Sequence, residues 1–338
     1  MATLKEIASL AGVSTTCVSI VLNRKPEMQK IPEATRQRIQ KIALDLNYKP
    51  NVSARALQRG NSENTIFIGV LQAYDNFMLS VLMTRVWYGM TRAVLKSGKN
   101  IQIINYPFHA GKLYKQRDML MATQCHGIIA SNASENDLEY LEKELFNVPV
   151  LMYLQNNKRY SSIGIDDIKV GKLAARALHS NGCKRPMCLI NDDVFTVDIR
   201  ERSFIEEAEI LGMTPLERDK AVTIDLKEAY QIITSFDQDS MPDSFFCAND
   251  YIAYSVISAI RDRGLRVPED IKIVSVGNGI VDLEKTFTPK LSTVSMPLEE
   301  MGEACLNAIL EMIENPEYQP FRREMPVVYE PRETCGPI

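Results

Sequence analysis

The sequence predicts an α/β core preceded by a small all-α domain, and three observations lead to this prediction. From Ile66 onward, short β-rich runs alternate with amphipathic helical segments, a pattern typical of parallel sheets connected by helices. The first 60 residues contain helical patterns only. A chain of 338 residues is also longer than one hydrophobic core usually supports, so we expect two or three domains.

Charge is distributed unevenly between these two parts. Residues 1–60 contain ten Lys and Arg against four Asp and Glu, a net charge of +6, whereas the remainder contains 29 against 39, a net charge of −10. A basic N-terminal segment favours a partner that carries phosphates, and the acidic remainder argues against polyanion binding over the whole surface.

Three short helices are predicted within the basic segment. The first is followed by Gly12, where a helix can end, and its apolar face is formed by Leu4, Ile7, Ala8 and Ala11. The second begins after Ser14, a suitable N-cap residue, and its inward face is formed by Val18, Val21 and Leu22. The third begins near Pro32, and its inward stripe is formed by Ile39, Ile42, Ala43 and Leu46.

Three small helices around a shared core form the minimum body of a helix-turn-helix module. The second helix of such a module enters the major groove of DNA with its N-terminal side chains toward the base edges. Thr15 and Thr16 occupy that end of the second helix. A small helical bundle that binds nothing is the alternative, because helical hairpins are common. The basic charge favours the DNA-binding interpretation.

Two stretches carry a resemblance to a known family. Residues 4–23, LKEIASLAGVSTTCVSIVLN, resemble the helix-turn-helix of the LacI family of bacterial transcriptional regulators, and residues 47–60, NYKPNVSARALQRG, resemble its hinge. In that family the hinge helices of two subunits pair on DNA, and a leucine, here Leu57, enters the minor groove. The resemblance implies a homodimer on a pseudo-palindromic double-stranded DNA operator. The residues that it places on DNA are Thr3, Ser14, Thr15, Thr16, Ser19, Ile20, Asn23, Arg24, Tyr48, Asn51, Ala54 and Leu57.

Ile20 departs from the family pattern, which often has a polar or basic residue at this place. An apolar side chain can contact a thymine methyl group but cannot hydrogen-bond a guanine edge, so we expect a different base preference. The loop at residues 23–31 is longer than usual in the family and contains Arg24, Lys25 and Lys30, which we interpret as phosphate contacts. A solvated basic loop is the alternative.

Seven β-rich runs are expected to form buried strands. They are IFIGVL at 66–71, IQIINY at 101–106, HGIIA at 126–130, VPVLMYL at 148–154, MCLIN at 187–191, SFFCAN at 244–249 and IKIVSV at 271–276. Helices are expected over 79–97, 168–181, 199–211 and 250–263. The family resemblance continues over residues 245–275 and 287–310, so it covers essentially the whole chain.

Through this resemblance we expect two Rossmann-like lobes of the periplasmic-binding-protein type I, with an effector site in the cleft between them. The predicted domains are a helix-turn-helix domain at 1–50, a hinge helix and linker at 51–64, and an effector-binding and dimerisation core at 65–338. Within the core, the N-lobe is expected over about 65–161 and 292–320, and the C-lobe over about 162–291 and 321–338. By analogy, the dimer face is expected at residues 81–94 and 110–122.

Four residues are candidate effector contacts. Arg200 takes the place of the arginine with which the family grips effector hydroxyls or carboxylates, and its planar fork suits that task. Asn249 matches a second cleft position, Gln155 follows the strand at 148–154, and Phe77 is a candidate for stacking on a ligand. The alternatives are a helix-surface ion pair with a glutamate for Arg200 and a core or lid position for Phe77.

Two carboxylates of sugar-binding relatives are missing. Gly277 stands where the family has an aspartate in a motif resembling GFDD, and Leu154 stands in place of a second aspartate. Each carboxylate accepts two hydroxyl protons, so their loss removes much of the grip on a polyol. We therefore expect a small-molecule effector other than a simple monosaccharide, with a carbohydrate-derived molecule as one alternative.

The sequence contains no recognisable catalytic motif. It lacks a P-loop, a G-x-G-x-x-G after a strand, H-E-x-x-H and G-x-S-x-G, so we expect no enzyme activity, no cofactor and no metal. The seven scattered cysteines favour a reduced, cytoplasmic protein, and the lack of a long apolar run favours neither export nor a membrane span.

The sequence thus predicts a cytoplasmic, homodimeric, ligand-responsive transcriptional regulator, with repression favoured over activation. An activator of the same family is one alternative. A cytosolic small-molecule binding protein without a regulatory role and an enzyme that uses the α/β cleft are the others.

Overall fold

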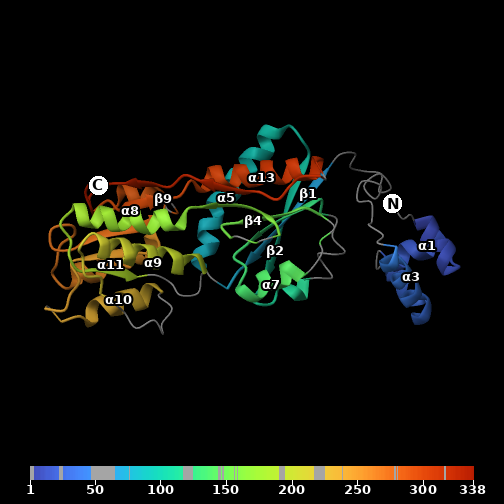
Figure 1. Ribbon diagram of the computed structural model, residues 1–338, viewed down its shortest axis with the longest axis horizontal. Coiled ribbons are helices and arrows are strands. Elements are labelled where there is room, and N and C mark those ends of the chain that lie inside the picture. Colours follow the sequence, from blue (N-terminus) through green and yellow to red (C-terminus); the bar gives the residue numbers. More distant parts are fainter. Residues whose placement is uncertain are drawn as a thin grey trace.

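The computed structural model describes residues 4–22, 26–46, 65–75, 77–116, 125–143, 146, 148–155, 157, 159–189, 195–216, 225–237, 239–277, 279, 281–315 and 317–338. The predicted hinge at 51–64 lies outside these residues, and its prediction stays untested. Figure 1 shows the described parts as an N-terminal group of helices and a larger α/β core.

The N-terminal domain contains three helices, α1 (Leu4–Ala11), α2 (Thr15–Leu22) and α3 (Glu33–Asp45), with a 3-10 turn, η1 (Pro26–Lys30), between the last two. Their shared apolar core is formed by Ile7, Ala8, Ala11, Val18, Val21, Ile39 and Ala43. Gly12 ends α1 with a φ of 61°, a conformation that favours glycine. The prediction that Leu46 faces inward is wrong: it lies just beyond the end of α3 at Asp45 and is 36% exposed.

Two sheets form the core, and the seven β-rich runs all contribute strands to them. The first sheet contains β1 (Ile66–Ala73), β2 (Ile101–Phe108), β3 (Gly127–Ser131), β4 (Val150–Tyr153), β5 (Ser161–Ile165) and β10 (Arg322–Met325), in the order β10-β5-β4-β3-β1-β2. The second contains β6 (Pro186–Leu189), β7 (Ser244–Cys247), β8 (Lys272–Gly277), β9 (Ser292–Ser295) and β11 (Val328–Glu330), in the order β11-β9-β8-β7-β6. All described strand pairs are parallel except β11 with β9.

Helices cover both faces of each sheet, and the four predicted helices are among them. The helices are α5 (Phe77–Ser97), α7 (Glu135–Lys143), α8 (Asp167–Ser180), α9 (Phe195–Ile210), α10 (Leu226–Ser235), α11 (Asp250–Asp262), α12 (Val281–Thr286) and α13 (Leu298–Glu314), with a 3-10 turn η2 (Leu113–Gln116). In Figure 1, α13 and α5 lie on one side of the first sheet and α7 on the other. This is the two-lobe α/β architecture that the strand and helix pattern predicts.

Three strands belong to the opposite lobe from the one predicted. Strands β5 and β10 pair with each other in the N-lobe sheet, although 162–291 and 321–338 were assigned to the C-lobe. Strand β9 pairs with β8 in the C-lobe sheet, although 292–320 was assigned to the N-lobe. The chain therefore crosses between the lobes four or five residues later than predicted each time. The three segments, SSIGI, STVS and RREM, are rich in small and charged residues, so their strand signal is weak.

Side chains alternate between the two faces of the N-lobe sheet. One face contacts α5 and α13 through Ile68, Val70, Ile129, Leu151 and Tyr153. The other face belongs to a separate cluster formed by Leu71, Ala73, Phe108, Leu113, Ile128, Ala130, Leu141, Val150 and Met152. The first cluster continues into the C-lobe, where α8, α9, β8 and β9 also contribute to it. We call this continuous set of side chains the shared core.

Helices α5 and α13 approach each other very closely at two glycines. A Cβ atom at Gly302 would lie 2.2 Å from the carbonyl oxygen of Val86, and one at Gly89 would lie 2.0 Å from that of Glu299. Because backbone atoms line both contacts, no side-chain rotation can relieve a larger residue there.

We therefore expect Gly302→Ala to lower the free energy of unfolding by about 1–3 kcal/mol, because the helices must separate to admit the methyl group. Urea denaturation followed by circular dichroism measures the change. Asn307→Ala, at an exposed position of the same helix, is the matched control and should stay within about 0.5 kcal/mol of wild type. Equal urea midpoints for Gly302→Ala and wild type would contradict the close approach.

Candidate functional site

Helix α2 has a buried face and an exposed N-terminal turn. Val18 and Val21 are buried in the helical core, whereas Thr15 and Thr16 are exposed. The hydroxyl oxygen of Ser14 accepts the backbone N–H of Cys17 at 3.1 Å, which caps the helix in the predicted way. The core thus fixes the helix, and the side chains of its first turn are left at the surface.

The other predicted DNA contacts are only partly covered by the described residues. Ser19 and Ile20, on α2, are both partly exposed. The remaining seven predicted contacts lie outside the described residues; they are Thr3, Asn23, Arg24, Tyr48, Asn51, Ala54 and Leu57.

Arg200 lies where the chain crosses between the lobes. It is on α9, is 7% exposed, and its Nε donates to Oδ1 of Asp167 at 2.7 Å. Its Nη2 lies 3.9 Å from the sulfur of Met296, which directly follows β9. The ion pair is with Asp167 at the start of α8, whose side chain is 13% exposed, so the predicted alternative of a helix-surface pair with a glutamate is wrong. Burial raises the pKa of Asp167, and the Arg200 guanidinium acts in the opposite direction.

Ser203 of α9 and Gly171 of α8 face each other beside Arg200. Ser203 stands where the family pattern has glycine, and its hydroxyl donates to the carbonyl oxygen of Arg200 at 3.0 Å. Gly171 faces it from α8, where an added Cβ would lie 2.2 Å from the Ser203 hydroxyl. Because the space is provided from the facing helix, α8 and α9 still pack closely and hold Arg200 beside Asp167.

Two of the other three predicted effector residues are bonded to the backbone. Gln155 is bonded twice to the backbone of Ala133: its Oε1 accepts the N–H at 2.7 Å and its Nε2 donates to the carbonyl at 2.6 Å. Asn249 caps α11 by accepting the N–H of Ile252 at 3.0 Å. Phe77 begins α5, and its side chain lies outside the described residues. The structure therefore brings Arg200 to the junction of the lobes and gives Gln155 and Asn249 backbone partners.

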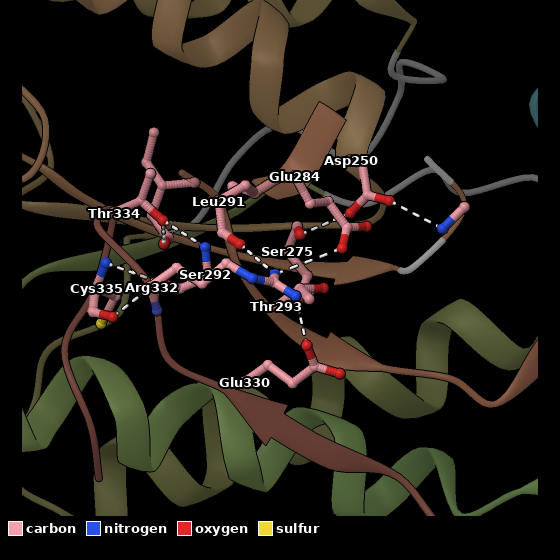
Figure 2. Close-up of polar contacts among 12 residues, drawn as sticks. Asp250, Ser275, Glu284, Leu291, Ser292, Thr293, Glu330, Arg332, Thr334 and Cys335 are labelled. Carbon is pink, nitrogen blue, oxygen red and sulfur yellow. Dashed lines mark hydrogen bonds and ion pairs between the residues drawn. The ribbon is translucent and has the colours of Figure 1, made fainter. Parts of the chain in front are cut away.

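A carboxylate from a neighbouring element fills the space beside Gly277. A Cβ atom at Gly277 would lie 1.9 Å from Oδ1 of Asp250, the first residue of α11. Asp250 accepts the hydroxyl of Ser275 at 2.9 Å and the N–H of Gly279 at 3.2 Å (Figure 2). An aspartate at 277 is thus incompatible with the position of Asp250, whose own carboxyl is 1% exposed and directed into the protein.

Asp250 also faces a second buried carboxyl, that of Glu284 on α12 (Figure 2). Arg332 lies on the far side of Glu284, with 3.4 Å between its Nη1 and the Glu284 Oε2, and it also pairs with Glu330. Burial, followed by the hydrogen bond and charge of Glu284, raises the pKa of Asp250 well above its usual range. Asp250 therefore holds its proton to higher pH than an ordinary aspartate does. Sequence reasoning missed this pair, because its members are 34 positions apart with no motif between them.

The buried Asp250 carboxyl should make stability depend on pH. The folded protein keeps a proton that the unfolded chain releases above about pH 4. The free energy of unfolding should therefore fall as the pH rises from about 4 toward the folded-state pKa. Asp250→Asn removes this contribution, so thermal unfolding followed from about pH 5 to 9 should decline less steeply than in wild type.

Asp270→Asn is the matched control for this measurement. Hydrogen bonds from Arg266 lower the pKa of Asp270, so the contribution of Asp270 is lost only as the pH falls through the acid range. This variant should follow the wild-type profile from pH 5 upward. Parallel profiles for wild type and Asp250→Asn would contradict a protonated Asp250.

The described residues contain neither a candidate metal site nor a single helix of membrane-spanning length and apolarity. They contain no group of three or more His, Cys, Asp or Glu side chains placed to hold a metal ion. No single described helix is long and apolar enough to cross a membrane; α1 and α2 meet that requirement only as a pair, bent by 105° at their break.

Comparison with known proteins identifies two family matches within the chain. Residues 3–51 match the model of the bacterial regulatory proteins of the lacI family, and residues 175–335 match a periplasmic binding protein-like domain. The HTH-type transcriptional repressor PurR of Aliivibrio fischeri is 31% identical over 332 residues, covering 94% of each chain. The HTH-type transcriptional regulator YvdE of Bacillus subtilis is 29% identical and covers 92% of each chain.

Solved structures share the fold at lower identity. The lac repressor dimer bound to operator and an anti-inducer is 20% identical, with a TM-score of 0.69 and 98% of each chain covered. The complex of the regulator CelR with cellobiose is also 20% identical, with a TM-score of 0.69 over 99% of this chain and 100% of the other. By its near full-length similarity to PurR and its matching N-terminal domain, the chain belongs to the LacI family of bacterial regulatory proteins and is a ligand-responsive regulator of transcription.

Proposed function

We propose that the protein is a cytoplasmic repressor that binds a pseudo-palindromic operator as a homodimer and is controlled by a small molecule bound between the lobes. The observation that carries the DNA-binding part is helix α2, whose apolar side is buried while Thr15 and Thr16 are exposed. One such module has too little surface for specific affinity, so two modules related by two-fold symmetry are needed. The lac repressor, a relative in fold, is a dimer on its operator.

Helix α5 supports the proposed dimer. Its Tyr88 and Leu95 are 60% and 79% exposed and lie seven residues apart, on one side of the helix. Arg85 and Arg92, within the same predicted dimer face, instead pair with Glu299 of α13 in the same chain. We therefore assign the contact with a second subunit to the apolar side of α5.

The effector part of the proposal rests on Arg200. A buried guanidinium at the junction of two lobes, held on one side by Asp167, offers its remaining N–H groups to a ligand acceptor. CelR, which shares the fold, is solved with cellobiose. The proposal contains no catalytic step and no cofactor, and the basic N-terminal domain favours it over a binding protein without a regulatory role.

Selection of bound DNA from a random pool by the full-length protein tests this function. A pseudo-palindromic product is expected, and its affinity should fall steeply with salt, by a slope of about −0.9 in log K against log salt for each phosphate neutralised. Residues 61–338 alone, the control, should remain a folded dimer without DNA affinity. Recovery of no enriched sequence, or a salt-independent affinity, would contradict the proposal.

Ile20 should read a thymine methyl group within that operator. Replacing the contacted thymine by uracil removes only the methyl group, so wild-type affinity should fall about fourfold, the effect of one buried methyl group. Ile20→Ala should bind both operators equally, as measured by fluorescence anisotropy. A variant that still distinguishes thymine from uracil would show that another residue makes the contact. Gln40→Ala, at an exposed position of α3, is the control and should distinguish the two operators as wild type does.

A further inference from the structure

The first residues of β1 are held beside β3 by His126. The backbone N–H of His126 donates to the carbonyl oxygen of Phe67 at 2.7 Å, and the backbone N–H of Phe67 donates to Nδ1 of the His126 ring at 3.0 Å. The two rings also stack, with 6.0 Å between their centroids and 13° between their planes. Both backbone groups of Phe67 are therefore bonded to one residue, and one of these bonds goes to a side chain that can change its charge.

This contact lies at the start of the N-lobe sheet, directly after the part of the chain that connects it to the N-terminal domain. Strand β1 begins at Ile66. On the β2 side, Asn100 holds the same strand start: its carbonyl oxygen accepts the N–H of Ile66 at 2.8 Å, and its side-chain N–H₂ donates to the hydroxyl of Thr65 at 2.7 Å. Asn100 does not titrate, whereas His126 does. The β3 side is thus the pH-sensitive side of this strand start.

A ring nitrogen is a conditional acceptor. In a regular parallel ladder, the N–H of Phe67 would donate to a carbonyl oxygen of the neighbouring strand, which accepts at any pH. The Nδ1 atom of His126 accepts only while it carries no proton. A proton on Nδ1 turns it into a donor, so two N–H groups face each other and the Phe67 N–H loses this acceptor. Leaving a covered donor without a partner costs far more than one ordinary hydrogen bond contributes.

The surroundings of His126 favour its neutral form at neutral pH. Burial lowers the pKa of His126, and the backbone of Phe67 acts more weakly in the opposite direction. Within the described residues, no charged side chain contributes to this pKa. The titratable groups on the adjacent elements are Tyr106 of β2 and Cys125, which are bonded to each other at 3.5 Å; burial raises the pKa of Tyr106, so it stays neutral. His126 therefore takes up a proton only below about pH 6.5.

We propose that His126 is a pH-sensitive switch, in which protonation of Nδ1 releases the first residues of β1 from β3 and weakens operator binding. This inference rests on the proposed operator binding and needs no ligand between the lobes. A dimer on a two-fold operator needs its two N-terminal domains at a fixed spacing. A released strand start adds conformational freedom that operator binding must remove again, so affinity falls with the pH.

Operator affinity measured by fluorescence anisotropy from pH 5.5 to 8, at constant ionic strength, tests the switch. His126→Asn places an amide oxygen near the position of Nδ1 and does not titrate, so its contact with Phe67 persists at every pH. All variants gain positive charge in acid, so the ratio of the wild-type Kd to the His126→Asn Kd is the quantity measured. We expect a ratio near one at pH 8 and of about five or more at pH 5.5.

Two further variants separate the switch from other effects of pH. His126→Phe keeps an aromatic ring beside Phe67 but has no acceptor, so it should bind the operator as weakly at pH 8 as wild type does at pH 5.5, relative to His126→Asn. His179→Asn is the matched control, because His179 is exposed in the last turn of α8. It should keep the wild-type pH profile.

Hydrogen–deuterium exchange of the full-length protein without DNA tests the contact itself. The peptide that contains Phe67 should exchange about fivefold faster in wild type than in His126→Asn at pH 5.5, and equally fast in both at pH 8. Comparing the two proteins at one pH removes the intrinsic pH dependence of exchange. This readout does not depend on an operator.

Three results would overturn the inference: equal exchange of wild type and His126→Asn at pH 5.5, a Kd ratio that does not change with pH, or a pH profile that His179→Asn abolishes. Loss of operator binding by every variant at every pH would contradict the proposed function, and the effect on operator binding with it. Normal operator binding with equal exchange would contradict only the role of His126.

Discussion

The two lobes share one continuous apolar core, and the position of the candidate effector site depends on it. Side chains from α5 and α13 of the N-lobe and from α8 and α9 of the C-lobe belong to the same cluster. Protein interiors are packed as densely as organic crystals, so such a cluster does not deform gradually. One lobe can move against the other only by repacking to a second discrete arrangement. A ligand at this junction therefore acts on a choice between arrangements.

Burying charged groups in this region costs folding free energy, and apolar packing alone gives no reason for their presence. The Arg200–Asp167 pair is about nine-tenths buried, and such pairs often stabilise a fold less than apolar residues of the same volume would. Removing one partner is nevertheless strongly unfavourable, because it leaves an unpaired buried charge. The Asp250–Glu284 pair avoids the same cost by keeping a proton. Buried charges at the crossing of the lobes thus restrict how the lobes can be arranged, and a ligand that completes their hydrogen bonds favours one arrangement.

The sequence predicted the repeating elements well and the irregular ones poorly. The seven apolar runs became strands because Val, Ile and Phe in short runs suit a sheet buried on both faces. Strands β5, β9 and β10 have no such pattern, and only their backbone pairing reveals them. Helical spacing correctly predicted that Val18 and Val21 are buried. The prediction that Leu46 faces inward was wrong, because the end of a helix is poorly marked in sequence.

The candidate site was less predictable than the fold, for a physical reason. Arg200 was found through its family position, but the residue that holds it, Asp167, comes from another helix 33 positions earlier. The loss of a carboxylate at Gly277 was visible in the sequence; that Asp250 fills the same space was not, because it depends on where α11 begins relative to β8.

In the proposed mechanism, the binding energy that an effector supplies limits how far it can change DNA binding. Moving a two-state protein from mostly one arrangement to mostly the other requires about 5.5 kcal/mol of differential binding energy, whereas a hydrogen bond to a charged group contributes about 1.5–3 kcal/mol. Arg200 alone therefore falls short, and contacts from both lobes are needed. The N-lobe contact matters most for DNA, because β1 begins at Ile66, directly after the segment that connects the N-terminal domain, and lies between β3 and β2 inside the N-lobe sheet. A ligand group held between the N-lobe sheet and Arg200 of α9 would fix that sheet relative to the C-lobe.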